Sequence, residues 1–269
     1  MASERIPIDD GDLDALEEVL RRASGLSLSP GMRRALPAAV AEAAATVDAL
    51  PGAFLRRLLD GEAEAVASLV ERTVVGETYF WRHPEQLEAL RTLAFQAEGP
   101  VHVWSAGCAS GEEPYSLAMV LLESGRSGRG DRILASDISA RALARSRHAR
   151  YAAWSLRRLP GELRQRYLRG DPPAAEVVPE VRELVSLSRN NLVADPPPGS
   201  GFDVVICRNV LIYFDPVLAA EVLYKLLGAT RPGGLLVLGP VELPIAREVE
   251  ADWLDVAGAT VLRRRPSPP

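Results

Sequence analysis

A loop with two glycines and two adjacent glutamates follows the first strand-like run of the chain. The segment Ala106–Pro114 contains Gly107 and Gly111, and Glu112 and Glu113 open the apolar helical run that comes next. Glycine lets the backbone approach a ligand closely, and a helix N-terminus offers free N–H groups to a carboxylate. The two glutamates would repel the pyrophosphate of a dinucleotide and attract a positively charged ligand. Alternatively, both glutamates only complement the dipole of the helix.

A single aspartate follows the second strand-like run. Asp137 comes directly after Ile133–Ser136, where its carboxylate is placed to accept hydrogen bonds from both ribose hydroxyls of an adenosine or, alternatively, to cap a helix. The glutamates of the glycine loop favour a ligand with an ammonium and a sulfonium, and the helix N-terminus favours a carboxylate on the same ligand. A ligand that combines these groups with an adenosine is S-adenosylmethionine, which the two loops together favour.

Amide and guanidinium groups follow the third and fourth runs. Asn191 can pair with an adenine edge while Leu192 packs on the ring, although asparagine is also a common turn residue. Arg208 and Asn209 emerge directly from the buried run Val204–Cys207, where polar groups without partners are costly. We therefore expect Arg208 and Asn209 to face the ligand.

An aromatic segment that ends in an arginine precedes the sheet. Tyr79, Phe80 and Trp81 are consecutive, and Arg82 follows them. Three large aromatic side chains in a row predict a packed joint between the helical part of the chain and the sheet. Arg82 is expected to project from this joint.

The elements that must position these residues follow two different patterns. The first 75 residues carry apolar residues at helical spacing, interrupted by glycine- and proline-containing turns, which predicts four short helices. From residue 100 onward, short apolar runs alternate with helical stretches, which predicts a mostly parallel sheet with crossover helices. The runs are Val101–Ala106, Ile133–Ser136, Val185–Leu187, Val204–Cys207 and Leu235–Leu238.

Two further segments modify this sheet. Trp253–Val256 and Thr260–Arg263 flank Ala257-Gly258-Ala259, which predicts an antiparallel hairpin at the sheet edge. Between residues 149 and 187 the pattern is looser and indicates an insertion, within which Glu176–Leu187 is expected to form a small antiparallel hairpin. The predicted fold class is α/β, with a small all-helical domain in front.

The composition excludes several classes of protein. A chain of 269 residues with 47% hydrophobic and 25% charged residues is neither disordered nor fibrous, and its net charge of −5 argues against nucleic-acid binding as its main task. Two cysteines and three histidines predict no disulfide framework and no metal site, so Cys108 and Cys207 are expected to be buried free thiols. The acidic N-terminus and the lack of a long apolar run predict a cytoplasmic protein without membrane insertion.

Four motifs carry a resemblance to a known family. In chain order they are GETYFWR (Gly76–Arg82), SAGCASGEEPYSLAM (Ser105–Met119), ASDIS (Ala135–Ser139) and FDVVICRNVLIYFD (Phe202–Asp215). The chain resembles the CheR family, S-adenosylmethionine-dependent methyltransferases that modify glutamates of bacterial chemotaxis receptors.

The resemblance implies an organisation for the whole chain. It implies a helical N-terminal domain over residues 1–75, a linker with a cofactor-site motif over 76–98, and an S-adenosylmethionine-binding methyltransferase domain over 99–269. This last domain would have a class-I methyltransferase-like (Rossmann-like), mostly parallel sheet with a C-terminal antiparallel hairpin, and a small β-subdomain inserted at about 170–187. The product would be S-adenosylhomocysteine, and the partner a protein substrate such as chemoreceptor-like cytoplasmic helices.

The resemblance also implies roles for individual residues. Together with Gly107 of the glycine loop, the expected cofactor-binding residues are Thr78, Arg82, Glu113, Asp137, Asn191, Leu192, Arg208 and Asn209. Arg82 and Tyr213 stand where the family has its catalytically important pair. Arg82 would hold the second oxygen of the acceptor carboxylate, and Tyr213 would aim the nucleophile or contact the methyl region.

The sequence departs from the family pattern at three places. Gly76 stands where an asparagine is common, and only Arg33 and Arg34 remain of a longer basic run. The segment Gly239–Pro244, GPVELP, replaces a GHSE-like segment but keeps Glu242. Two alternatives therefore stay open: a class-I methyltransferase with another acceptor, and a regulatory module that binds S-adenosylmethionine or S-adenosylhomocysteine without turnover.

Overall fold

The computed structural model describes residues 8–266, which form two compact units. Residues 8–75 and 213–218 make up the helical unit, and residues 76–212 and 219–266 make up the α/β unit. The short segment 213–218 thus belongs to the same unit as residues 8–75, although it is distant from them in sequence.

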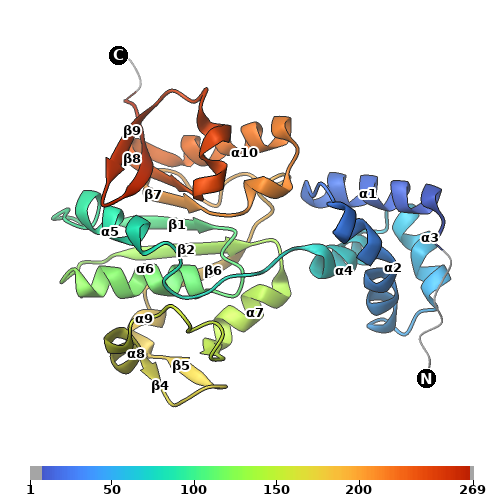
Figure 1. The fold of residues 1–269 in the computed structure, drawn as a ribbon, viewed down its shortest axis with the longest axis horizontal. Helices are drawn as coiled ribbons and strands as arrows, with labels where there is room; N and C mark the ends of the chain where they lie inside the picture. Colours follow the sequence, from blue (N-terminus) through green and yellow to red (C-terminus); the bar gives the residue numbers. More distant parts are fainter. Residues whose placement is uncertain (1–7, 267–269) are drawn as a thin grey trace. The chain divides into compact units, whose positions relative to one another are not determined.

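The helical unit contains the four expected helices. They are α1 (Asp10–Ser24), α2 (Pro30–Ala45), α3 (Pro51–Leu59) and α4 (Ala63–Thr73) (Figure 1). Local chemistry sets their ends: the Asp9 carboxylate accepts a hydrogen bond from the Asp12 N–H at 2.8 Å, and Gly25 ends α1 in the left-handed conformation at φ 77°. The side chains that hold the unit together are fully buried and include Leu16, Leu20, Val40, Phe54 and Leu69.

One arginine of the sparse basic face is already paired within the helical unit. The Arg33 guanidinium lies 2.8 Å from Asp14 Oδ1 and 3.1 Å from Glu17 Oε2, both on α1. Arg34 remains exposed. The basic face predicted from the sequence is therefore smaller than its two arginines suggest.

The α/β unit is built on a sheet of seven strands in the order β6-β2-β1-β7-β8-β10-β9. The first five strands in this order are parallel, and β10 and β9 add an antiparallel pair at the edge. This confirms the predicted fold class, the five strand-like runs and the terminal hairpin. The strands are β1 (His102–Ala106), β2 (Arg132–Asp137), β6 (Val185–Arg189), β7 (Phe202–Cys207), β8 (Thr230–Leu238), β9 (Ala251–Val256) and β10 (Ala259–Arg264).

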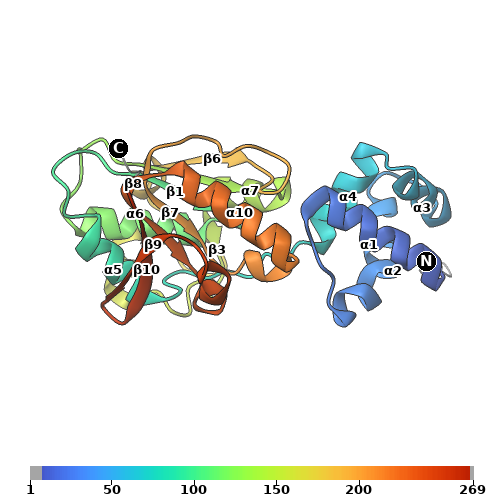
Figure 2. The same ribbon diagram turned by 90° about the horizontal axis from the view of Figure 1, so that it is seen from above.

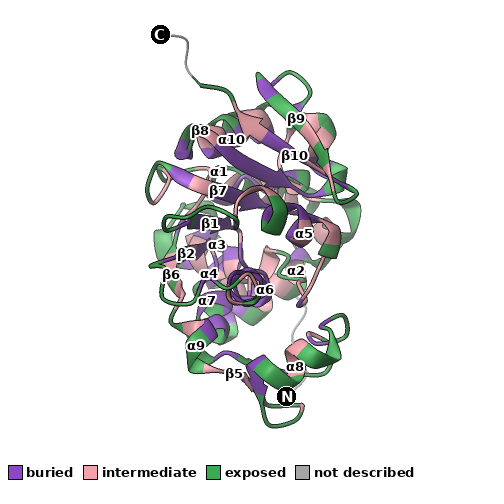
Figure 3. Ribbon diagram, turned by 90° about the vertical axis from the view of Figure 1, so that its left-hand side faces the viewer, coloured by how far each residue is buried: buried purple, intermediate pink, exposed green. Residues whose placement is uncertain are grey.

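Helices cover the sheet and connect its parallel strands. α5 (Pro84–Leu93) packs beside α6 (Glu112–Glu123) and β10, and α7 (Ala140–His148) packs on β2 and β6 (Figure 1). α10 (Pro216–Ala229) runs alongside β7 and β8, the two strands that it connects (Figure 2). The central strands form the buried core between these layers (Figure 3).

The insertion folds differently from the expected hairpin. Its three-stranded sheet has the order β3 (Arg150–Tyr151), β5 (Ala175–Val177) and β4 (Leu168–Arg169), with α8 (Gly161–Tyr167) between β3 and β4. Residues 176–187 do not form a hairpin, because α9 (Pro179–Arg182) interrupts them and β6 pairs parallel to β2 in the main sheet. In the large sheet, β6 pairs with β2 over its full length, whereas β5 has only three residues with which it could pair.

A buried ion pair lies at the end of the sheet where the parallel strands begin. The Arg126 guanidinium lies 2.7 Å from Asp131 Oδ1, and both side chains are only 1% exposed. Arg126 also donates to the carbonyl oxygens of Phe95 and Gly99, and Asp131 accepts from the Val101 N–H at 2.8 Å. This network ties the segment before β1 to the segment before β2.

Among residues 8–266, no helix has both the length and the apolar character that a membrane crossing requires. The same residues contain no cluster of His, Cys, Asp and Glu side chains suited to a metal ion.

Candidate active site

Loops from the carboxyl ends of β1, β2 and β7 meet at one edge of the sheet. Gly107, directly after β1, has φ 78°, and a Cβ added to it would lie 2.5 Å from Val210 Cγ2 in the loop after β7. Because only glycine fits this backbone conformation and this close approach, the two loops pack directly on each other. The glycine loop therefore depends on the position of the segment that follows β7.

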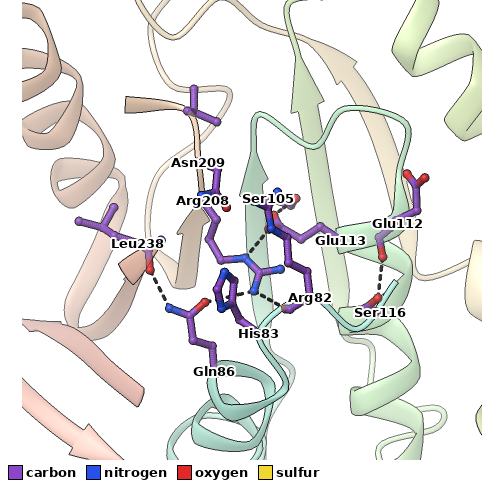
Figure 4. Close-up of polar contacts among 12 residues, drawn as sticks. Arg82, His83, Gln86, Ser105, Glu112, Glu113, Ser116, Arg208, Asn209 and Leu238 are labelled. Carbon is purple, nitrogen blue, oxygen red and sulfur yellow. Dashed lines mark hydrogen bonds and ion pairs between the residues drawn. The ribbon is translucent and has the colours of Figure 1, made fainter. Parts of the chain in front are cut away.

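A buried ion pair stands at the centre of this edge. The Arg208 Nε donates to Glu113 Oε2 at 2.7 Å, and the two side chains are 3% and 10% exposed. Figure 4 shows that Arg208, from the end of β7, and Glu113, from the first turn of α6, point toward each other. The sequence predicted that both residues would face the ligand; the structure shows that they bind each other.

Two residues that were not predicted from the sequence form hydrogen bonds with this ion pair. Ser105, inside β1, donates to Glu113 Oε1 at 2.7 Å, and Gln86, on α5, accepts from Arg208 Nη1 at 3.1 Å and donates to the Leu238 carbonyl at 2.7 Å. A signal was present for Gln86, because it shares one helical face with buried Ala89 and Leu90. A glutamine on an apolar helix face indicates a buried polar partner.

The two adjacent glutamates of α6 face different partners. Glu112 is 2% exposed, accepts from the Ser110 and Ser155 hydroxyls at 2.8 and 2.9 Å, and its carbonyl accepts from the Ser116 hydroxyl at 2.6 Å. Ser116 in turn accepts from the Trp81 N–H at 3.0 Å. Glu112 thus connects the aromatic segment and the insertion to α6, whereas Glu113 binds Ser105 and Arg208.

Asp137 joins the loops after β1 and β2. Its Oδ2 accepts from the Ala109 N–H at 2.8 Å, and its Oδ1 accepts from the Ser139 N–H at 2.9 Å. The N-cap of α7 is Ser139, so the alternative role of Asp137 as the cap is wrong. Asp137 therefore links the glycine loop to the start of α7.

The residues after β6 form a turn. The Asn191 side-chain oxygen accepts from the Val193 N–H at 3.0 Å, and the Leu192 carbonyl accepts from Lys225 at 3.3 Å. The Asn191 oxygen therefore shapes the loop, in keeping with the alternative noted for an asparagine in a turn.

The aromatic segment carries Arg82 on a stack of side chains. The Arg82 guanidinium lies 5.6 Å from the centre of the Tyr79 ring, and Arg157 lies 3.9 Å from the same ring and 3.9 Å from the exposed Trp154 ring. Arg82 Nη1 donates to the Glu77 carbonyl at 3.2 Å. The Arg82 carbonyl accepts from Arg208 at 2.6 Å, so the backbone of this segment is held by the central ion pair.

Two further predicted site residues, Thr78 and Tyr213, belong to different units. Thr78 is partly buried beside Tyr79 in the aromatic segment. Tyr213 ends the short helix η1 (Leu211–Tyr213) and belongs to the helical unit, where its carbonyl accepts from the Ser27 N–H at 2.7 Å.

Four residues of the α/β unit's site loops adopt positive φ angles that non-glycine residues seldom use. They are Trp81 (63°), His83 (57°), Ala109 (47°) and Asn209 (60°). Such conformations are costly for residues with a Cβ, and they gather where the surrounding structure holds a functional geometry. Their concentration at this edge supports its identification as the candidate active site.

Neither a histidine nor a cysteine of the site is set up for nucleophilic or acid–base chemistry. Burial, followed by the charge of Arg208, lowers the pKa of His83, so its imidazole is neutral at physiological pH. Burial raises the pKa of the Cys108 and Cys207 thiols well above the usual value, which keeps them protonated. Both cysteines are free and buried, as predicted.

The site suits a ligand with the charges of S-adenosylmethionine. Glu113 and Asp137 provide carboxylates, and the side-chain oxygen of Asn209 is buried with no hydrogen-bond partner among the described residues. A buried oxygen without a donor is costly unless a ligand supplies one. S-adenosylmethionine combines an adenosine with an ammonium and a sulfonium. It therefore offers hydrogen-bond donors to the Asn209 oxygen and positive charge beside the two carboxylates.

Comparisons with known proteins identify the family that the chain matches. Residues 76–254 match the family described as "CheR methyltransferase, SAM binding domain". Chemotaxis protein methyltransferase 2 of Pseudomonas aeruginosa is 35% identical over 193 residues, which cover 68% of this chain and 69% of that protein. Chemotaxis protein methyltransferase of Escherichia coli (strain K12) is 35% identical over 171 residues, which cover 61% of this chain and 60% of that protein.

A relative named for biofilm formation is similar to the chain as well. "Probable biofilm formation methyltransferase WspC" of Pseudomonas aeruginosa is 33% identical over 220 residues, which cover 78% of this chain and 52% of that protein. The chain thus spans about half the length of this relative.

Proposed function

Because the chain belongs to the CheR family of S-adenosylmethionine-dependent methyltransferases, we propose that it methylates glutamate side chains of a protein and forms glutamate methyl esters. The observation that carries the proposal is the buried Glu113–Arg208 pair. It lies at the carboxyl ends of the strands, as do Asp137 and the Arg82 backbone that Arg208 binds. This arrangement offers carboxylates to a cationic cofactor and a guanidinium to an anionic acceptor.

The proposed cofactor contacts follow the loops of the site. Glu113 would bind the amino group, Asp137 the ribose hydroxyls, and Asn209 a donor of the cofactor through its unpartnered oxygen. Arg208 would act mainly through Glu113, because it is 3% exposed and already donates to that carboxylate. We assign Thr78, Gly107, Asn191 and Leu192 to the walls of the same pocket.

The proposed reaction requires no proton transfer. The side chains of the site therefore need only align the acceptor with the methyl group and exclude water. The cofactor supplies an electrophilic methyl group on a sulfonium. A glutamate oxygen, ionised at neutral pH, forms a bond to the methyl carbon while the carbon–sulfur bond breaks and its electron pair goes to sulfur. Arg82 would hold the other carboxylate oxygen, and Tyr213 would orient the attacking one, so that alignment provides most of the rate.

The proposed acceptor is the cytoplasmic, helical part of a chemoreceptor-like protein, which places the enzyme in the cytoplasm. Support comes from relatives named chemotaxis protein methyltransferases. Because Arg33 is paired on α1, we expect the helical unit to bind an acidic receptor weakly and in a salt-sensitive manner.

The proposed function is tested by methyl transfer. The protein is incubated with methyl-labelled S-adenosylmethionine and receptor cytoplasmic domains, and the label in protein is measured before and after mild base. Base-labile label indicates a carboxyl ester. Base-stable label would point to another acceptor group, and an absence of transfer despite cofactor binding would favour a regulatory module.

Replacing Asp137 with alanine should weaken S-adenosylhomocysteine binding by about 1–3 kcal/mol, since a carboxylate that accepts ribose hydroxyls is lost. The affinities of S-adenosylhomocysteine and its 2′-deoxy analogue are compared by calorimetry in both proteins. The wild type should discriminate between the two ligands, and the Asp137→Ala variant should not.

A matched control is Asp203→Ala, at the amino end of β7. Asp203 also accepts from a backbone N–H, that of His102 at 2.8 Å, and pairs with Arg231 at 2.6 Å. This variant should keep the wild-type preference between the ligands. Retained discrimination in Asp137→Ala would show that Asp137 only shapes the loop.

A further inference from the structure

Glu242 is a charged residue at the carboxyl end of the sheet with no solvent exposure. It lies in the short helix η2 (Pro240–Ala246) that follows β8. Its Oε2 accepts from the N–H groups of Gly239 and Asn209, and its Oε1 accepts from those of Val210 and Leu211, all at 2.8 Å.

Four backbone N–H groups take the place of a cation here. Within residues 8–266 no Lys, Arg or His side chain forms an ion pair with Glu242. Burial raises the pKa of its carboxyl, and the four N–H bonds oppose that effect. Burying a carboxylate is expensive unless its oxygens are satisfied, so this position is suited to an acceptor of four hydrogen bonds.

The contact fixes the loop after β7 to the end of β8. A Cβ on Gly239 would lie 2.7 Å from Glu242 Oε2 and 3.2 Å from the Asn209 N atom, so the two segments approach as closely as glycine allows. Three consecutive residues, Asn209 to Leu211, are held by one side chain. A loop held in this way cannot shift one residue without losing a bond of the carboxylate.

The held loop carries parts of the candidate cofactor site. Asn209 has φ 60°, and its buried side-chain oxygen has no hydrogen-bond partner within residues 8–266, which points to a ligand donor. Val210 lies against Gly107 of the glycine loop, where no Cβ would fit. The position of the loop after β7, and of the glycine loop that packs on it, therefore depends on Glu242.

We infer that Glu242 is a positioning residue: its carboxylate holds residues 209–211 so that Asn209 and the glycine loop present a preformed surface to S-adenosylmethionine. Glu242 itself does not touch the reacting atoms. The inference rests on the proposed cofactor role of Asn209 and is independent of the identity of the methyl acceptor.

The test is the affinity for S-adenosylhomocysteine of the Glu242→Gln variant of the full chain. The amide has the size of the carboxylate, but its NH2 would face two N–H donors, so two of the four bonds are lost. We expect the affinity for S-adenosylhomocysteine to fall about tenfold or more, because the loop that loses two hydrogen bonds to residue 242 no longer presents a preformed surface. Amide hydrogen exchange at Val210 and Leu211 should accelerate in the same variant.

The control is Asp131→Asn, which changes an equally buried carboxylate at the amino end of the sheet. This variant should lose thermal stability but bind S-adenosylhomocysteine as the wild type does. Affinity of Glu242→Gln within twofold of the wild type would overturn the inference, whatever its stability.

A second variant covers the case in which Glu242→Gln does not fold. Glu242→Asp keeps the charge but is one methylene shorter, so it cannot reach all four N–H groups. It should show a smaller loss of affinity, and an unchanged affinity would equally overturn the inference. Methyl transfer is not needed for either readout, so a wrong acceptor assignment leaves the test intact.

Discussion

Replacing Arg82 with lysine should lower methyl transfer by about two orders of magnitude or more, while the fold is retained. Lysine keeps the positive charge but lacks the planar fork that holds a carboxylate by two parallel hydrogen bonds. A misaligned acceptor can cost about a hundredfold in rate. The backbone of the segment should not move, because Arg208 binds the Arg82 carbonyl and not its side chain.

The measurement is single-turnover transfer to a receptor domain, accompanied by S-adenosylhomocysteine affinity. Arg157→Lys is the matched control, because Arg157 stacks on the same Tyr79 ring at 3.9 Å. If the fork of Arg82 is what matters, Arg157→Lys should retain most of the rate. Similar losses in both variants would assign the effect to the stack, and a wild-type rate in Arg82→Lys would remove Arg82 from catalysis.

The fold was predictable where a segment's own pattern decides its structure. Each of the central strands β1, β7 and β8 contains a buried apolar stretch, so all three were visible as runs regardless of their neighbours. The turn residues Ala257-Gly258-Ala259 also predicted the terminal hairpin. In the structure Ala257 and Gly258 both have positive φ, as a tight hairpin turn requires.

Prediction failed where the partner decides the structure. The run at Val185–Leu187 was correctly expected in the main sheet, but the residues before it were assigned to a hairpin that does not form. Nothing local distinguishes pairing with β5 from pairing with β2. The packing of residues 213–218 with the helical unit is likewise a contact between distant segments, and the sequence has no local signal for it.

The candidate site was predictable in its residue types but not in its internal bonds. Glu113 and Arg208 were each identified as ligand-facing from their positions after β1 and β7. That they neutralise each other required the geometry, since 95 positions separate them in sequence. Glu242 was noted only because the segment GPVELP keeps the glutamate of a GHSE-like segment. Its four backbone partners appear only when the ends of β7 and β8 are placed together.

Replacing Arg208 with methionine should destabilise the protein by about 3–5 kcal/mol, because it leaves the Glu113 carboxylate buried without its cation. Adding Glu113→Gln in the same chain should recover part of this loss, since a neutral amide replaces the unpaired charge. The recovered protein should still bind S-adenosylhomocysteine poorly, because the amino group of the ligand no longer meets a carboxylate. Chemical denaturation and calorimetry measure the two effects separately.

The Arg126–Asp131 pair provides the matched comparison, since it is as buried but lies at the amino end of the sheet. Arg126→Met should cost a similar free energy of unfolding, and adding Asp131→Asn should recover part of it, with cofactor affinity unchanged throughout. A failure of Glu113→Gln to recover stability would assign the loss to the Arg208 bonds with Gln86 and the Arg82 carbonyl. Wild-type affinity in the Arg208→Met, Glu113→Gln protein would show that Glu113 is structural only.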